Sequence, residues 1–385
     1  MNNETLRIVL IHRRSFQERP PVISVYSHLV SLGFNPILIT AGINRYYEDV
    51  LQNNKTPYYV IPFKINKNNQ LRNIINGFIW GYKVRRLINR ISKNGNLLLW
   101  IEGNYTFDSL SAAFVNKYPH ILQNQELFNS PMTYKGRYTM RTLKHIMPTS
   151  IVNIAPEYNR ACIYKSLFQL KEKPVILPNK PTFILSNDEI QMLADKYEAY
   201  REMIGSRKVI LYQGILSKER NLENFVRAAS ELNKNEYVTV LLGRVTPLVR
   251  KYKSIDPDLL HIDFIPAPDY LYFTQLAYIG IVTYTSDSLN TMYCAPNKLF
   301  EYGAYGIPMI GNDIAGLKYT IGYYGCGEVC DENSVSNIKD TINKIINNYS
   351  EYSKRSYNYY NSTNNKDVVN KIVNIAMKKT GCKLQ

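Results

Sequence analysis

The sequence predicts an α/β protein with two domains, each built around a parallel sheet. Short apolar runs alternate with helical patterns along the chain, which is typical of parallel α/β sheets. A length of 385 residues allows two domains with separate cores. Residues 175–181 end in Pro-Asn-Lys-Pro, a composition that suits a linker. We therefore expect domains at 1–178 and 179–360, followed by a terminal helix within 361–385.

The first domain begins with an apolar run at residues 7–12. A basic loop closed by prolines follows, then a helical pattern at 22–32 and a second strand at 36–40. In parallel sheets, ligands bind at the carboxyl ends of strands. This order places His12, Arg13 and Arg19 at the binding edge, where we expect them to face a substrate.

Two more strands are predicted at 58–63 and 97–102, with a long helix at 71–93 between them. The helix ends in a cluster of cations, Lys83, Arg85, Arg86, Arg90 and Lys93. It is either a crossover helix whose cations favour its C-terminal dipole or a helix on a membrane surface, with Phe78 and Trp80 near the interface. A second basic and aromatic patch favours surface binding: Tyr134, Lys135, Arg137, Tyr138, Arg141 and Lys144.

The second domain opens with a polar helix at about 187–204 and a buried strand at 208–213. Gly214 follows the strand, and Arg220 precedes a helix that begins at Asn221. A strand, a glycine turn and a helix N-terminus form a phosphate-binding geometry. Further strands at 237–242, 260–265 and 279–284 end at the same edge, the first two beside Gly243 and Pro266.

The most informative stretch spans residues 295–313 and reads as a short helix followed by a buried strand. Pro296 suits the first helical position, and Gly306 with Pro308 closes the helix. Free N–H groups near Asn297 and the charge of Lys298 favour an anion at the first turn. Glu301 lies one turn on, about 5–6 Å from Lys298. A phosphate site beside a carboxylate that can bind a diol suits a nucleotide.

The run Pro296-Asn297-Lys298-Leu299-Phe300-Glu301-Tyr302, followed by Gly306-Ile307-Pro308, resembles the nucleotide-sugar site of the retaining GT-B glycosyltransferases. Within them it is similar to family four, in its bacterial surface-polysaccharide branch. The resemblance implies two Rossmann-like domains facing a cleft, with a C-terminal helix that returns to the first domain. It also implies that Glu301 holds the ribose hydroxyls and that Lys298 lies near the donor diphosphate.

The resemblance extends to a full set of candidate residues. Those implied for the donor are Gly214, Arg220, Gly243, Pro266, Asn297, Lys298, Leu299 and Glu301. The catalytic candidates are Arg220, Lys298 and Glu126, the last because its loop resembles one that carries a polar residue beside the transferred sugar. Glu102, at the end of the preceding strand, is a further acceptor-side candidate with His12, Arg13 and Arg19. Both glutamates have a plainer interpretation as solvated loop carboxylates.

The chain departs from the family at two positions. Ile215 stands where an Arg usually contacts the diphosphate, and Tyr293 stands where a Glu often faces the donor sugar. The first departure concerns neutralisation of the leaving group. The second prevents any inference about which sugar is transferred.

The positive charge lies in the first half of the chain. Residues 1–178 carry 23 Lys and Arg against 9 Asp and Glu, net +14, whereas residues 179–385 carry 24 against 22, net +2. Such a basic half implies an anionic partner, and we favour a membrane surface over nucleic acid. The early sequence lacks a secretory signal and no apolar stretch is long enough to span a membrane, so we expect a cytoplasmic protein at the inner face of the membrane.

The sequence offers little support for metal or cofactor chemistry. The five cysteines are scattered and read as reduced thiols, and Asp256-Pro257-Asp258 has an ordinary turn composition. No Walker loop, serine elbow or complete dinucleotide fingerprint is present. We expect no metal and no cofactor besides the nucleotide-diphosphate sugar.

The function that these features predict is transfer of a sugar from a nucleotide-sugar donor to a growing surface glycan. A capsule, O-antigen or exopolysaccharide on a lipid-diphosphate carrier would be the acceptor, and the resemblance implies retention of configuration. Two alternatives remain open: a nucleotide-sugar epimerase of the same fold, and a non-catalytic protein that binds membranes or nucleic acid.

Overall fold

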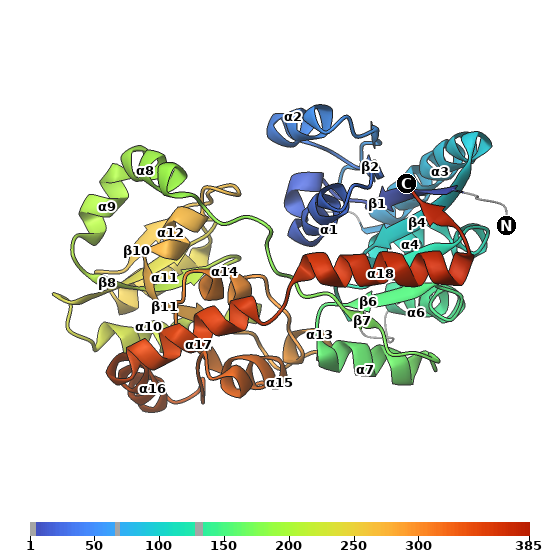
Figure 1. The fold of residues 1–385 in the computed structure, drawn as a ribbon. Helices are drawn as coiled ribbons and strands as arrows, with labels where there is room; N and C mark the ends of the chain where they lie inside the picture. The colour runs from blue at the N-terminus through green and yellow to red at the C-terminus, as the bar shows by residue number, and fades with distance from the viewer. Residues whose placement is uncertain (1–4, 66–69, 128–133) are drawn as a thin grey trace. The chain divides into compact units, whose positions relative to one another are not determined.

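The computed structural model describes residues 5–65, 70–127 and 134–385. The chain divides into two compact units. Unit 1 contains residues 1–182 and 364–385, and unit 2 contains residues 183–363. Each unit holds one sheet whose strands all run parallel, so the predicted α/β class is confirmed (Figure 1).

The sheet of unit 1 has the order β3-β2-β1-β4-β5-β6-β7, and β14 pairs with β1. The strands are β1 (Thr5–Ile11), β2 (Ile37–Thr40), β3 (Tyr58–Val60), β4 (Asn96–Glu102), β5 (His120–Gln123), β6 (Val152–Ala155), β7 (Val175–Ile176) and β14 (Lys383–Leu384). The strand order reverses at β1 and β4, which pair in register from Leu6 with Asn96 to Ile11 with Ile101. A reversal of this kind opens a binding crevice at the carboxyl ends of the two strands.

Helices and short turns connect these strands. They are η1 (Phe16–Glu18), α1 (Pro20–Ser31), α2 (Arg45–Asn53), α3 (Gln70–Ile91), η2 (Ser92–Asn94), α4 (Asn104–Leu110), α5 (Ala112–Val115), α6 (Tyr134–Ile146), α7 (Tyr158–Leu167) and α18 (Asn365–Thr380). The last of them returns to unit 1, as expected, and packs against α1 (Figure 1). Its apolar side chains Val369, Ile372 and Val373 are buried in the core that includes Val25 and Leu29.

Helix α3 departs from one expectation. Trp80 is 1% exposed, and its Nε1 donates to the carbonyl of Ile61 at 2.8 Å. The prediction that this ring lies near a membrane interface is therefore wrong, because the ring belongs to the inward face of the helix. Phe78 is on the outward face and is 48% exposed. The side chains of Tyr134 and Lys135, predicted in a second basic patch, lie outside the described residues.

The sheet of unit 2 has the order β10-β9-β8-β11-β12-β13. The strands are β8 (Lys208–Gln213), β9 (Tyr237–Leu242), β10 (Leu260–Ile262), β11 (Ala277–Val282), β12 (Met309–Asn312) and β13 (Gly327–Cys330). The helical elements are α8 (Asn187–Lys196), α9 (Glu198–Ile204), η3 (Lys218–Arg220), α10 (Glu223–Ser230), α11 (Pro247–Ile255), α12 (Leu271–Gln275), α13 (Leu289–Met292), α14 (Lys298–Ala304), α15 (Ala315–Leu317), η4 (Lys318–Gly322), α16 (Val335–Asn347) and α17 (Tyr349–Asn361). Here the strand order reverses between β8 and β11.

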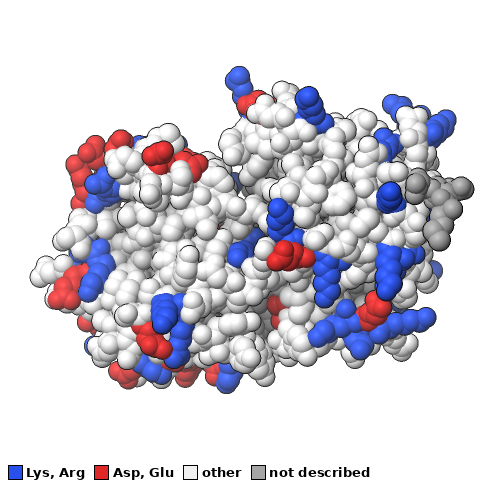
Figure 2. Space-filling view, viewed as in Figure 1, with Lys and Arg blue, Asp and Glu red and all other residues white. Residues whose placement is uncertain are grey.

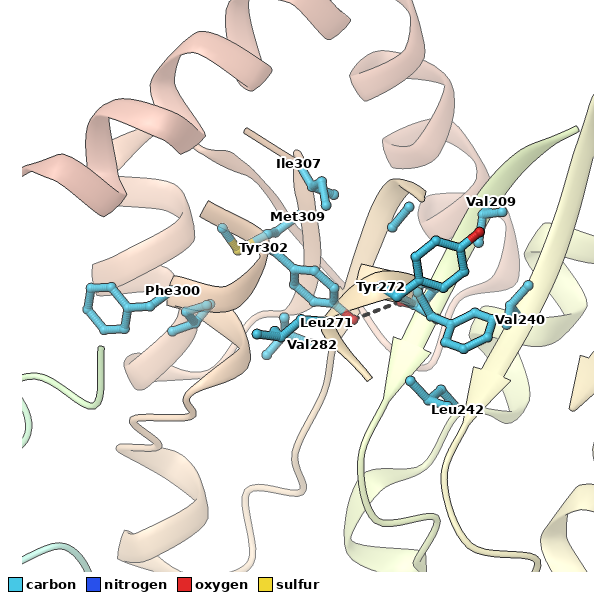
Figure 3. Close-up of a cluster of buried hydrophobic side chains, with 14 of the residues drawn as sticks. Val209, Val240, Leu242, Leu271, Tyr272, Val282, Phe300, Tyr302, Ile307 and Met309 are labelled. Atoms are coloured by element: carbon cyan, nitrogen blue, oxygen red, sulfur yellow. Dashed lines mark hydrogen bonds between the residues drawn. The ribbon is translucent and has the colours of Figure 1, made fainter. Parts of the chain in front are cut away.

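Helix α14 is held on the sheet by Tyr302 (Figure 3). This ring is fully buried, and its hydroxyl donates to the carbonyl of Leu211 at 3.0 Å. The ring also fills the space above Gly280, where a Cβ would lie 2.5 Å from it. The helix ends before Gly306, which has φ +64. These contacts fix the start of α14 at the carboxyl ends of β8 and β11.

Candidate functional site

Two glycines open the binding edge of unit 2. Gly214 follows β8 with φ +128, and a Cβ there would lie 3.4 Å from Nζ of Lys298. Gly243 follows β9, and a Cβ there would lie only 2.1 Å from the carbonyl oxygen of Gly214. The structure therefore brings both predicted glycines together beside Lys298, and the lack of a side chain at Gly243 lets the two turns approach one another.

Lys298 lies at the start of α14, and its side chain is buried. Its Nζ stands 4.0 Å from the centre of the Tyr212 ring and has no hydrogen-bond partner within the described part of the chain. Burial, reinforced by the charge of Arg220, lowers the pKa of Lys298 from 10.5 to about 7. Burying an ammonium without an anionic partner is costly. The arrangement therefore suits an anion that supplies the missing charge.

Arg220 ends the short turn η3 on the neighbouring loop. Its guanidinium lies 4.9 Å from the centre of the Tyr284 ring. The N–H of Thr285 donates to the carbonyl of Glu219 at 2.9 Å, which ties this loop to the one after β11. Arg220 and Lys298 thus form a pair of cations beside the glycine turn. Ile215, one of the two positions where the sequence departs from the resemblance, is 65% exposed and adds no charge.

Glu301 is buried one turn along α14 from Lys298. Its two carboxylate oxygens accept hydrogen bonds from Nε2 of Gln213 at 2.5 Å and from the hydroxyl of Tyr270 at 2.6 Å. The hydroxyl of Thr274 donates to Oε1 of Gln213 at 2.7 Å and extends the chain of hydrogen bonds. Burial raises the pKa of Glu301, although both hydrogen bonds oppose the shift. Each oxygen keeps a further lone pair for a ligand hydroxyl.

The remaining donor-side candidates lie around the same edge. Pro266 is exposed on the loop that leads from β10 to Tyr270, and Asn297 directly precedes α14. Leu299 is 1% exposed, so its side chain belongs to the core and only its backbone can face a ligand. The exposed ring of Phe264, after β10, is covered by the guanidinium of Arg244 at 4.8 Å.

Unit 1 has a pocket of its own at the ends of β1 and β4. It is lined by Arg13, Arg14, Arg19, Glu102, Gly103, Asn104, Tyr105, Thr106, Gln125, Glu126, Leu127 and Thr139. Four predicted acceptor-side or catalytic residues therefore share one pocket: Arg13, Arg19, Glu102 and Glu126. Arg19 forms an ion pair with Glu102, which is 2% exposed.

Arg13 is held by aromatic and polar contacts. Its guanidinium lies 4.4 Å from the centre of the Phe63 ring, and its Nη1 donates to Oγ of Ser109 at 2.6 Å. Burial lowers the pKa of Arg13 to about 10, so it stays positive at neutral pH. The guanidinium of Arg14 lies 5.6 Å from the centre of the Tyr105 ring in the same pocket.

His12 lies behind this pocket and is fully buried. Its Nδ1 accepts from the N–H of Arg14 at 3.3 Å, and its Nε2 lies 3.2 Å from the hydroxyl of Thr40. Because that hydroxyl donates to the carbonyl of Arg14 at 2.8 Å, Nε2 carries the ring proton. Burial and the charge of Arg19 lower the pKa of His12 to about 3. A neutral His12 thus shapes the loop, and its predicted contact with substrate stays a prediction.

Sequence reasoning missed several residues of both sites. Gln213, Tyr270 and Thr274 are joined to Glu301 only by folding, and no local pattern marks them. Tyr105 and Thr106 reach the unit 1 pocket from the start of α4. No group of His, Cys, Asp and Glu arranged for a metal occurs among the residues that the structure describes.

Comparison with known proteins gives a family match to one part of the chain and a fold match to the whole of it. Residues 197–362 match the family model described as glycosyl transferases group 1. The match covers most of unit 2, including Gly214, Arg220, Lys298 and Glu301. A search of curated protein sequences finds no match to the chain.

Solved structures resemble the whole chain. Anabaena Alr3699/HepE in complex with UDP-glucose has a TM-score of 0.67 at 11% identity, covering 98% of this chain and 99% of its own. A glycosyltransferase from Rickettsia africae has a TM-score of 0.64 at 14% identity, covering 97% of each chain. A protein from Listeria monocytogenes that is assigned as a UDP-N-acetylglucosamine 2-epimerase has a TM-score of 0.59 at 15% identity, covering 98% of each chain. At these identities the likeness shows the GT-B fold alone.

Proposed function

We propose that this protein is a glycosyltransferase that moves a sugar from a nucleoside-diphosphate sugar to an acceptor. The observation that carries the proposal is the buried ammonium of Lys298, which has no hydrogen-bond partner among the described residues. It lies beside Gly214, where the strand order of unit 2 reverses. The match of residues 197–362 to glycosyl transferases group 1 supports the same activity. The similar fold of a protein that binds UDP-glucose supports a nucleotide-sugar donor.

In this proposal Lys298 and Arg220 act on the leaving group. Negative charge grows on the diphosphate as the bond to the sugar breaks, and fixed cations at that point lower the barrier. The two residues would supply the charge that a metal ion supplies in other enzymes, so the mechanism we propose is metal-independent. Glu301, oriented by Gln213 and Tyr270, would accept hydrogen bonds from the ribose hydroxyls.

The unit 1 pocket is proposed to hold the acceptor. Glu102 and Glu126 offer carboxylates for sugar hydroxyls, and Arg13, Arg14 and Arg19 suit an anionic group such as the diphosphate of a lipid carrier. Glu126 is the proposed catalytic contact with the transferred sugar. The more specific function that we propose is extension of a bacterial surface glycan with retention of configuration, which the resemblance of residues 296–308 supports. The basic first half of the chain supports a location at the inner face of the membrane.

The epimerase alternative shares the fold, as the Listeria monocytogenes structure illustrates. The two activities differ in their need for an acceptor. Incubation of the protein with a nucleotide sugar alone, followed by analysis of the configuration of the sugar in the recovered nucleotide sugar, separates them. An epimerised nucleotide sugar formed without acceptor would replace our proposal.

The donor site is tested by calorimetry with UDP, GDP, TDP and ADP on the wild type and on Glu301→Gln. We expect one diphosphate to bind with a micromolar dissociation constant and the variant to weaken it by roughly 1–3 kcal/mol, as for a lost charged hydrogen bond. Gln preserves the shape of the buried site. The matched control is Glu351→Gln, an exposed carboxylate on α17, which should bind as the wild type does.

If no diphosphate binds, or if Glu301→Gln binds as well as the wild type, the buried cations and carboxylate of α14 are structural. The non-catalytic interpretation would then account better for the basic first half of the chain.

A further inference from the structure

Helix α3 has two faces of different character. Its inward face packs on unit 1 through Gly77, Trp80, Gly81, Val84, Ile88 and Ile91, all of which are buried. A Cβ at Gly81 would lie 1.8 Å from the carbonyl oxygen of Ser109, so the helix touches α4 backbone to backbone. Arg85 donates to that same carbonyl at 3.0 Å. The helix is therefore firmly held by one side.

The outward face exposes large apolar side chains. They are Leu71 (67% exposed), Ile75 (50%), Phe78 (48%), Ile79 (50%) and Tyr82 (54%), and we refer to them as the α3 apolar face. A surface helix normally presents polar residues on the side away from its core. A contiguous apolar patch of this kind marks a surface that contacts something other than water.

Cationic side chains lie on the same side of α3, nearer its C-terminus. Lys83, Arg86 and Arg90 are exposed, and the guanidinium of Arg86 lies 5.8 Å from the centre of the Tyr82 ring. At 100° per residue, these three and the α3 apolar face fall within an arc of about 140°. On this side the first half of the helix is mainly apolar, with Arg72 also exposed, and the second half is cationic.

A neighbouring helix adds to this charge. The ring of Tyr138 on α6 contacts Phe78, with ring centres 6.1 Å apart. From α6, Arg137, Arg141 and Lys144 are exposed at a spacing that places them on one side. Residues 50–101 contain nine Lys and Arg and no acidic residue. Lys and Arg also outnumber acidic side chains over unit 1 on the face shown in Figure 2.

We propose that the α3 apolar face, with the cations of α3 and α6, binds the surface of an anionic lipid bilayer. Aliphatic side chains enter the boundary between headgroups and acyl chains, and the flanking cations contact the headgroups. No helix among the described residues is long and apolar enough to cross a membrane.

The combination of features favours lipid over other partners. Two copies of this chain that met through α3 would bring like charges together. A nucleic acid would attract the cations and could stack on Phe78 and Tyr82. The aliphatic side chains Leu71, Ile75 and Ile79 would have no partner in such a complex. A lipid bilayer with anionic headgroups satisfies both the apolar and the cationic parts.

The test is co-sedimentation of the full chain, without nucleotide, with vesicles of phosphatidylcholine alone or with 30 mol% phosphatidylglycerol. We expect binding to the anionic vesicles. The triple variant Leu71→Ser, Ile75→Ser and Ile79→Ser should reduce it at least tenfold. The matched control Met192→Ser and Met203→Ser removes exposed apolar side chains from unit 2 and should bind as the wild type does.

A second pair of variants tests the charge. Lys83→Gln, Arg86→Gln and Arg90→Gln together should weaken binding to the anionic vesicles by roughly fivefold per cation. The control removes the same number of charges from unit 2, with Arg250→Gln, Lys253→Gln and Lys354→Gln. This control should bind the anionic vesicles as the wild type does. All six cations are exposed, so none of these variants opens the core.

The proposal is overturned if the wild type does not bind anionic vesicles, or if the α3 serine variant binds them as strongly as the wild type does. It is also overturned if sedimentation shows a dimer that the serine variant abolishes, because the face would then bind a second copy. Any of these results would leave the donor-site proposal standing, since no nucleotide takes part in the measurement.

Discussion

A buried ammonium that lacks an anionic partner is costly to keep in a fold, and Lys298 is such a group. The Tyr212 ring, 4.0 Å from Nζ, offsets part of this cost. Among the described residues Lys298 makes no ion pair that would offset the rest. Glu301, by contrast, is tied by Gln213 and Tyr270. We infer that Lys298 gains an anionic partner only when a ligand binds, whereas Glu301 is already held in position before binding.

The lowered pKa of Lys298 predicts how nucleotide affinity depends on pH. In the free protein its pKa is about 7, and a bound diphosphate will raise it. The complex therefore holds more protons than the free protein above pH 7. Affinity should be unaffected by this group below pH 7 and should fall by up to about tenfold per pH unit above it. Calorimetry between pH 6.5 and 9 measures the trend.

Proton uptake gives a second measure of the same prediction. Above pH 7, the apparent binding enthalpy of the wild type should change with the ionisation enthalpy of the buffer. The variant Lys298→Arg stays charged throughout, so it should lose both this buffer effect and the dependence on pH. An affinity that is constant from pH 6.5 to 9 in the wild type would contradict the role assigned to Lys298.

At the scale of elements, the proposed donor site lies at the carboxyl edge of the unit 2 sheet, where neighbouring segments of backbone lie close together. Gly214, Gly243 and Gly280 are constrained in two ways. Gly214 has φ +128, which residues with a side chain rarely adopt, and a Cβ at Gly243 or Gly280 would overlap a carbonyl oxygen or a ring. The first two follow strands and shape the space beside Lys298. The third lets Tyr302 seat α14 on the sheet. The position of the site therefore depends on three glycines and one tyrosine.

The variant Gly243→Ala tests this dependence. Its Cβ would lie 2.1 Å from the carbonyl oxygen of Gly214, so the turn after β8 must move. We expect a loss of roughly 1–3 kcal/mol in the free energy of unfolding, as for other overpacked sites, and at least tenfold weaker diphosphate binding. Urea unfolding and calorimetry measure the two effects. Gly322→Ala, where a Cβ meets nothing within 4 Å, is the control.

If Gly243→Ala bound the diphosphate normally, the turn after β8 would not line the donor site. An equal loss of stability in Gly322→Ala would instead indicate that glycine is needed for backbone freedom in general. Only a difference between the two variants supports the steric explanation.

Helices and strands could be predicted where a short stretch of sequence marks them. The strand before Gly214 and the helix from Lys298 are marked by short patterns, and the pair Lys298 and Glu301 follows from helical spacing. Interactions between distant segments were not predictable in this way. The hydrogen bonds of Glu301 join residues 88 and 31 positions away. Trp80 was misplaced because α3 is apolar on both sides, so periodicity could not tell which ring faces inward.

At the scale of the molecule, the chain is not divided into two consecutive pieces. Unit 1 includes residues 364–385, so its fold is completed only after unit 2 has been traversed. Helix α18 packs on α1, and β14 adds a short pairing to β1. The two units therefore differ in how they respond to loss of the C-terminus.

A chain that ends at residue 363 should lose the stability of unit 1 and keep that of unit 2. The deletion removes Val369, Ile372 and Val373, which are 0–1% exposed, and uncovers the apolar surface beneath them. At about 1.5–3 kcal/mol for each buried side chain, the loss is on the order of 5 kcal/mol, comparable with the whole stability of a small domain. Scanning calorimetry should show that one transition disappears, while a diphosphate still raises the Tm of the other. A chain that ends at Gly381 keeps α18 and should retain both transitions. If the chain ending at 363 also retained both transitions, unit 1 would not depend on α18. If the diphosphate shifted neither transition, the donor site would not lie within unit 2.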